Sequence, residues 1–168
     1  VSKNKFKIKI NIVNEKDKIL DTGGGILNAT KHFSNEPFIV INPDTIWNFN
    51  YLKELQLIEK NFLENEKEKC SLLLVNKKKS FDKSLGGDFN LENNLVKRDD
   101  KNNLDYIYTG LQIIKPEVFY NESLKVFSIN KVWSELIKNN NLHGIESHVD
   151  FLHVSTLNVY NSLLKKKI

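Results

Sequence analysis

The sequence predicts an α/β fold, with a mostly parallel sheet and helices on both of its faces. Two short apolar runs, at residues 38–41 and 71–75, have the length and composition of strands that are buried on both faces. Helical patterns separate such runs, and strands that alternate with helices at this spacing are typical of a parallel sheet. The chain has 168 residues, 40% of them hydrophobic, which is enough for one domain, residues 1–168, with its own core.

The first half of the chain predicts its elements in the following order. Apolar residues alternate with Lys and Asn over residues 6–12, which indicates a half-buried strand. A glycine-rich segment at residues 21–25 leads into a short helical pattern at 26–32. The strand at 38–41 ends in Asn-Pro-Asp-Thr, and a charged amphipathic helix is expected over residues 49–68.

The second half of the chain starts with a polar insertion. Residues 77–103 are rich in Asn, Asp, Lys and Gly, and their few apolar residues are enough only for a small β-hairpin. Regular structure is expected to return after it. The expected elements are a segment of regular structure at 106–114, a short helix that Pro116 starts, a helix at 130–139, extended pieces at 142–145 and 149–154, and a closing helix at 156–166.

Composition narrows the classes of function. The net charge is +4, but the excess comes from dispersed lysines, and Arg98 is the only arginine. Because arginine makes most bidentate contacts to bases, we expect no nucleic-acid partner. No apolar run approaches the ~20 residues of a membrane span, and residues 1–6 lack a secretory signal, so we expect a cytoplasmic protein without membrane contact. The single cysteine, Cys70, is interpreted as a small apolar residue that opens a strand.

The glycine-rich segment is the first candidate for a binding site. Thr22, Gly23, Gly24 and Gly25 lie between a predicted strand and a predicted helix. Glycines let the backbone approach a ligand closely, and a helix start offers free N–H groups to an anion or a nucleobase edge. Two interpretations stay open at this point, a ligand-binding loop or a tight turn.

Asp44 and His153 are the candidates for a metal site. Asp44 follows the strand at 38–41, and ligands of open α/β sheets bind beyond the carboxyl ends of strands. A carboxylate there suits Mg²⁺, although Asn-Pro-Asp is also good turn chemistry. His153 lies in the apolar run 151–154, where a histidine is either a partly buried hydrogen-bonding residue or a ligand. None of the four histidines has the spacing of a helical zinc motif.

Six segments, in order along the chain, resemble motifs of the sugar-1-phosphate nucleotidyltransferases. They are most similar to the branch that contains N-acetylmuramate-1-phosphate uridylyltransferases and mannose-1-phosphate guanylyltransferases. The segments are residues 20–26 (L-D-T-G-G-G-I), 38–47 (F-I-V-I-N-P-D-T-I-W), 87–89 (G-D-F), 106–113 (Y-I-Y-T-G-L-Q-I), 127–133 (F-S-I-N-K-V-W) and 151–156 (F-L-H-V-S-T).

The resemblance implies a Rossmann-like nucleotidyltransferase fold and a Mg²⁺-dependent reaction. A nucleoside triphosphate, UTP or GTP, would transfer its nucleotidyl group to a sugar 1-phosphate and release pyrophosphate, as in sugar-nucleotide synthesis for the cell wall. The resemblance also implies roles for individual residues. These are nucleotide binding by Thr22, Gly23, Gly24, Gly25 and Asn42, metal binding by Asp44, sugar-phosphate binding by Asp88, Thr109 and Gly110, and a place for His153 where many relatives have a second metal-binding aspartate.

The family's first motif has no counterpart in this chain. The family opens with a glycine-rich loop that ends in Arg and a Pro-Lys-Pro segment, whereas this chain starts with Val1 and contains no Met. We therefore expect a fragment that has little activity alone, and we assign no catalytic residue. The alternative is a non-catalytic sugar-nucleotide-binding or interaction module. The base, the sugar and the oligomeric state stay open.

Overall fold

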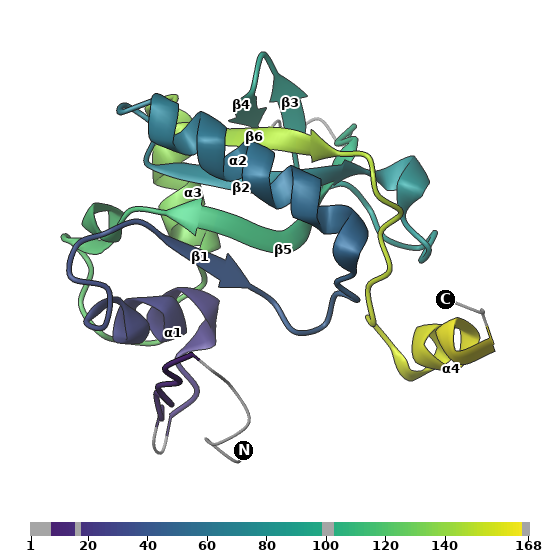
Figure 1. Ribbon diagram of the computed structural model, residues 1–168, viewed down its shortest axis with the longest axis horizontal. Helices are drawn as coiled ribbons and strands as arrows, with labels where there is room; N and C mark the ends of the chain where they lie inside the picture. Colours follow the sequence, from purple (N-terminus) through teal and green to yellow (C-terminus); the bar gives the residue numbers. More distant parts are fainter. Residues whose placement is uncertain (1–7, 16–17, 99–102, 166–168) are drawn as a thin grey trace.

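A six-stranded sheet with helices on both faces forms the centre of the molecule (Figure 1). The computed structural model describes residues 8–15, 18–98 and 103–165. The strand order is β1-β5-β2-β6-β4-β3. The strands are β1 (Phe38–Ile41), β2 (Cys70–Asn76), β3 (Asn90–Glu92), β4 (Leu95–Lys97), β5 (Tyr106–Ile114) and β6 (Leu142–Ser147). The α/β class is confirmed.

The prediction of a mostly parallel sheet is wrong. Only β2 and β6 pair in parallel among the described strands, and the other pairs are antiparallel. β1 and β2 are both antiparallel to β5, so they run in the same direction, as expected of strands that a helix connects. β5 nevertheless lies between them. It arrives after the hairpin insertion rather than after a helical crossover, and this makes the sheet mixed.

The position of β1 also differs from the prediction. We expected residues 38–41 to form an interior strand, but within the described part of the chain β1 pairs with β5 alone and forms an edge. Ile39 and Ile41 on this strand are 39% and 51% exposed. The corresponding prediction for β2 is confirmed, because β2 lies between β5 and β6 and its residues 70–75 are buried.

Helices cover the two faces of the sheet unequally. α2 (Leu52–Glu64) follows a 3₁₀ turn at Phe49–Tyr51 and crosses one face, where it packs against Leu73 of β2. α1 (Asp21–Thr30) and α3 (Asn130–Lys138) lie on the other face (Figure 1), and their cluster contains Leu72 and Leu74. Successive residues of β2 thus supply two separate cores.

The remaining elements follow the sequence patterns closely. A 3₁₀ turn at Pro116–Phe119 replaces the expected short helix, and the hairpin β3–β4 joins the main sheet where Leu95 pairs with His143. α4 (Leu157–Lys165) closes the chain. No helix in the described ranges is long and apolar enough to cross a membrane.

The predictions for two extended segments have different outcomes. Residues 8–12 form no strand, and the rest of the predicted strand 6–12 lies outside the described residues. Residues 149–154 make only isolated bridges, in which Ser80 pairs with Phe151 and Thr45 with His153. The second bridge places this segment beside the end of β1.

Candidate functional site

Asp44 and His153 form a direct contact just beyond the carboxyl end of β1. The Nε2 atom of His153 lies 3.2 Å from Oδ2 of Asp44. The backbone fixes this approach, because the N–H of Val154 donates to the carbonyl of Asp44 at 2.8 Å and Thr45 pairs with His153. The two residues that the sequence singled out for a metal site therefore lie side by side, while their role in binding a metal stays a prediction.

The ring of His153 is packed rather than free. It stacks on Phe151, with a centroid distance of 5.5 Å and an interplanar angle of 10°. Its Nδ1 atom is buried and has no hydrogen-bond partner within the described part of the chain. The side chain of Asp44, in contrast, is 49% exposed. The pair thus presents its carboxylate to a ligand more readily than its imidazole.

Asp82 adds a second acidic group beside this pair, one that the sequence reasoning missed. It accepts hydrogen bonds from the hydroxyls of Ser155 at 2.6 Å and Ser84 at 2.6 Å. These bonds, with the backbone N–H of Ser84 and the charge of His153, lower the pKa of Asp82. No sequence pattern connects residue 82 with residue 155, since the bridge from Ser80 to Phe151 brings their segments together.

The acidic side chains near His153 do not form a complete metal site by themselves. They suit a metal ion that binds together with the phosphates of its ligand. Within the described ranges, no group of three or more His, Cys, Asp or Glu side chains is arranged to hold a metal. Mg²⁺ commonly uses one or two carboxylates, waters and substrate phosphates, so Asp44 alone suits it. Imidazole is a weaker choice for Mg²⁺, and His153 is better suited to orient Asp44.

A polar pocket of about 230 Å³ adjoins this pair. It gathers side chains from α1, the end of β1, the hairpin, β5 and α3, which are far apart in the sequence. Asn42 belongs to the same loop as Asp44, and the pKa of Asp88 responds to the charge of His153. The polar residues that line the pocket are Thr22, Asn42, Asp88, Arg98, Tyr108, Ser128 and Asn130.

Three of the predicted site residues, Thr22, Asn42 and Asp88, therefore meet in one pocket. Asp88 accepts a hydrogen bond from the N–H of Tyr108 at 2.9 Å through Oδ2. Burial raises the pKa of Asp88, and the Tyr108 N–H and the charge of Arg98 oppose this effect. Sequence reasoning did not identify Arg98 as a site residue, although its being the only arginine is visible in the sequence.

The predicted glycine loop is instead the first turn of α1. Gly23 and Gly24 are buried, and the N–H of Gly24 donates to the carbonyl of Phe127 at 3.2 Å. A Cβ on Gly23 would lie 2.5 Å from the Phe127 ring, and one on Gly24 would meet the carbonyl oxygen of Lys125. These two glycines are explained by close packing of the helix on the 125–127 segment. Contact of Gly23, Gly24 and Gly25 with a nucleotide stays a prediction.

Thr109 and Gly110 of β5 form hydrogen bonds to the loop that carries Asn42 and Asp44. Thr109 is 1% exposed, and its hydroxyl donates to the carbonyl of Leu73 while its own carbonyl accepts from the hydroxyl of Thr45 at 2.7 Å. Gly110 has φ +93°, and its carbonyl accepts from the N–H of Asn42 at 2.8 Å. Both residues fix the loop that carries Asn42 and Asp44, and their contact with a sugar stays a prediction.

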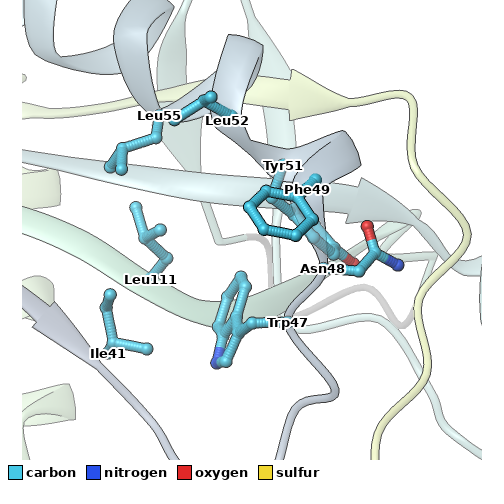
Figure 2. Close-up of a pocket in the computed structure, with 8 residues that line it drawn as sticks. All are labelled: Ile41, Trp47, Asn48, Phe49, Tyr51, Leu52, Leu55 and Leu111. Carbon is cyan, nitrogen blue, oxygen red and sulfur yellow. The ribbon is translucent and has the colours of Figure 1, made fainter.

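A second pocket, of about 300 Å³, lies between α2 and the edge of the sheet (Figure 2). Its walls are almost entirely apolar, and Ile41 of β1 and Leu111 of β5 form its floor. The indole N–H of Trp47 donates to the carbonyl of Asn42 at 2.9 Å, which ties this pocket to the loop of Asp44. The other lining residues are Asn48, Phe49, Tyr51, Leu52 and Leu55.

No family model matches the chain. Its sequence is 24% identical over 147 residues to the N-acetylmuramate alpha-1-phosphate uridylyltransferase of Caulobacter vibrioides, a match that covers 87% of this chain and 61% of the relative. The chain thus spans about three fifths of the length of the curated relative it matches.

Solved structures of nucleotidyltransferases are similar to this chain in fold. The inositol-1-phosphate CTP transferase from T. maritima matches with a TM-score of 0.62 at 14% identity, over 86% of this chain and 60% of that one. HddC from Yersinia pseudotuberculosis, complexed with GMP-PN, matches with a TM-score of 0.57 at 19% identity, over 89% of this chain and 64% of that one. The expected Rossmann-like nucleotidyltransferase fold is confirmed, with the mixed sheet described above.

Proposed function

From its similarity in sequence and fold to the sugar-1-phosphate nucleotidyltransferases, we propose that this chain transfers a nucleotidyl group from a nucleoside triphosphate to a sugar 1-phosphate, as part of a complete enzyme. The observation that carries the proposal is the contact between Asp44 and His153 beside a polar pocket. A carboxylate able to hold a metal–phosphate complex thus adjoins a pocket able to hold a sugar.

The Asp44–His153 pair and the polar pocket have different proposed roles. Asp44 would hold Mg²⁺, and the bound ion would neutralise phosphate charge. His153 orients the Asp44 carboxylate, and Asp88 accepts hydrogen bonds from sugar hydroxyls. Such transfer depends on positioning and on charge stabilisation more than on a covalent intermediate, because the sugar-phosphate oxygen attacks the α-phosphorus directly and pyrophosphate leaves.

UTP and GTP are the first nucleotides to test. The curated relative is a uridylyltransferase by name, and one structural neighbour was solved with GMP-PN. N-acetylmuramate 1-phosphate is the sugar phosphate named for the curated relative, which favours a role in cell-wall sugar metabolism. We propose a cytoplasmic location because nucleoside triphosphates are available there.

The test is Mg²⁺-dependent pyrophosphate release with UTP or GTP and a panel of sugar 1-phosphates. It compares residues 1–168 with a version extended to the full length of the relative, since this chain spans 61% of it. We expect turnover from the extended protein and little from residues 1–168. A triphosphate needs several hydrogen-bond donors and cations around the leaving pyrophosphate. Two lysines on the segment that contains Asp82 already donate hydrogen bonds to backbone carbonyls, Lys79 to that of His148 and Lys83 to that of Lys78.

The alternative, a non-catalytic sugar-nucleotide-binding module, gives a different result in the same experiment. The extended protein would then bind the sugar nucleotide and release no pyrophosphate. Turnover without added divalent cation would contradict the role of Asp44 as a metal ligand. Equal turnover from both lengths would show that residues 1–168 hold all the groups that the reaction needs.

A further inference from the structure

The backbone of residues 79–81 holds Phe151, the residue on whose ring His153 stacks. The N–H of Phe151 donates to the carbonyl of Lys79 at 3.0 Å, and the N–H of Phe81 donates to the carbonyl of Phe151 at 2.9 Å. Phe151 is 1% exposed, so its ring offers the imidazole a fixed surface. These contacts hold the chain two residues before His153.

Asp82 holds the chain two residues after His153. Its Oδ2 accepts from the hydroxyl of Ser155 at 2.6 Å, the length of a charge-assisted hydrogen bond. Residues 151, 153 and 155 alternate along the chain, and alternate residues of an extended segment point to the same side. The stacking of Phe151 on His153 agrees with this arrangement. Asp82 is thus attached on the side of the segment that carries the imidazole.

Asp82 is itself fixed by contacts within its own turn. Its Oδ1 accepts from the hydroxyl of Ser84 at 2.6 Å and from the backbone N–H of Ser84 at 2.9 Å, as in an Asx-turn. Its backbone carbonyl accepts from the hydroxyl of Ser80 at 2.9 Å, and Ser80 is 1% exposed. One carboxylate oxygen therefore secures the turn, and the other oxygen holds Ser155 in a defined place.

We propose that Asp82 is a positioning residue for the metal-binding carboxylate. Its hydrogen bond to Ser155 keeps the imidazole of His153 directed at Asp44, and this keeps the carboxylate oriented for Mg²⁺. The inference rests on the proposed function, in which Asp44 holds the ion. The path is short, because Ser155 is two residues from His153, whose Nε2 lies 3.2 Å from Oδ2 of Asp44. The N–H of Val154, between them, donates to the carbonyl of Asp44 at 2.8 Å.

The first measurement follows the ring of His153 by NMR in residues 1–168, with no metal or nucleotide added. It is made at a pH at which all four histidines are neutral, and His153→Gln identifies the signals. Asp82→Ala and Ser155→Ala should shift the His153 signals toward those of an exposed histidine, because the ring loses its fixed place on Phe151. Asp82→Asn should leave them in place, since its amide can accept from Ser84 and donate to Ser155.

The second measurement is pyrophosphate release by the extended protein across a titration of Mg²⁺. Loss of a group that orients a metal ligand typically costs about 10–100-fold in metal affinity or activity. Because Asp82 acts through two other residues, we expect Asp82→Ala to raise the half-saturating Mg²⁺ concentration about tenfold. Ser155→Ala should give the same rise, and the double variant no more than either single one, since both substitutions remove one contact. Asp82→Asn should stay within about twofold of the wild type.

Ser162→Ala is the matched control for loss of a hydroxyl. The Ser162 hydroxyl donates to the carbonyl of Asn158 within α4, away from the contact between Asp82 and Ser155. This variant should keep the wild-type Mg²⁺ dependence and the wild-type His153 signals. If Asp82→Ala does not unfold in a cooperative thermal transition, Ser155→Ala is the decisive variant.

Each other outcome contradicts a specific statement. A lower melting temperature of Asp82→Ala with unchanged His153 signals and Mg²⁺ dependence would show a purely structural role and overturn the inference. Equal effects of Asp82→Asn and Asp82→Ala would assign the role to the charge of Asp82 rather than to its contact with Ser155, which also overturns it. Absence of turnover from the wild-type extended protein contradicts the proposed function, while the NMR comparison still decides whether Asp82 positions His153.

Discussion

His153 Nε2 lies 3.2 Å from Asp44 Oδ2, and two backbone interactions between their segments hold the residues there. The contact connects the end of β1 with the segment that precedes α4, two segments that lie far apart in the sequence. Because the imidazole is stacked on Phe151, it limits the directions in which the carboxylate can point. This arrangement makes the carboxylate a preorganised group.

Replacement of Asp44 by Asn should reduce turnover of the extended protein at least ~10²-fold, the loss typical of one preorganised electrostatic group. The amide keeps the shape of the side chain and removes its charge, so the effect reports metal binding rather than packing. The measurement is Mg²⁺-dependent pyrophosphate release across a titration of Mg²⁺. Asp105→Asn, which removes a carboxylate paired with Lys77, is the control. Unchanged turnover in Asp44→Asn would show that Asp44 is only a turn residue.

Replacement of Asp88 by Asn should stabilise the fold at neutral pH. Burial raises the pKa of Asp88, so the folded protein holds this proton more tightly than the unfolded chain does. Stability is therefore lost as the pH rises from the ordinary aspartate value of about 4 through the raised value. Asparagine avoids this loss, and its oxygen still accepts from the N–H of Tyr108.

Thermal unfolding of the wild type and Asp88→Asn between acidic and neutral pH checks this expectation. The melting temperatures should coincide below the ordinary aspartate pKa, where both folded and unfolded carboxyls are protonated. They should separate as the pH rises, with the variant higher. A difference that does not depend on pH would mean that Asp88 acts through packing alone.

Replacement of Gly24 by Ala should destabilise the fold by about 1–3 kcal/mol, the usual cost of overpacking. The added methyl group would meet the backbone oxygen of Lys125, which cannot swing aside as the end of a flexible side chain can. Gly25→Ala is the matched control on the same helical turn. Its methyl group would meet only the side chain of Glu15, and alanine is a better helix former than glycine by about 1 kcal/mol.

Chemical denaturation of the two alanine variants gives the comparison directly. Gly25→Ala should be as stable as the wild type or more stable, within the small cost of moving Glu15, which accepts from the N–H of Leu20. Equal destabilisation by both substitutions would show that the turn needs glycine for its backbone rather than for packing.

The edge strand β1 should promote self-association of residues 1–168. Ile39 and Ile41 are exposed beside a strand edge that no other described strand pairs with, and such edges pair with other chains. Ile41→Lys should reduce the association measured by sedimentation at increasing concentration. Leu124→Lys, on a residue of similar exposure at 59%, is the control. Equal effects of both substitutions would assign the association to general hydrophobicity.

Local patterns in the sequence were enough to place most elements. β1 begins and ends where the patterns predict, and β5 coincides with the segment 106–114 in which regular structure was expected. α2, α3 and α4 differ from their predicted ranges by a few residues. These elements are recognisable because their apolar spacing follows from contacts made by each element separately. The juxtaposition of Asp44 and His153 was also expected, because both lie in segments whose motifs resemble those of one family.

Local patterns could not predict which strands pair with each other, or whether the pairs are parallel or antiparallel. Insertion of β5 between β1 and β2 depends on pairings between segments that are distant in the chain, and apolar runs look alike in parallel and antiparallel neighbours. The glycines of α1 misled the prediction because packing against Phe127 and ligand binding both require glycine. Arg98 and Asp82 were missed because only the folded chain brings them to the site.

The place of β5 between β1 and β2 also has a consequence during synthesis of the chain. Both earlier strands pair with β5, so neither obtains that partner until residues 106–114 have left the ribosome. At about 5–20 residues per second, translation of the segment between β2 and the end of β5 takes on the order of seconds. During that interval β2, whose residues 70–75 are buried in the folded chain, lacks this partner and stays accessible to chaperones. The length of the polar insertion at 77–103 therefore sets how long the nascent chain depends on them.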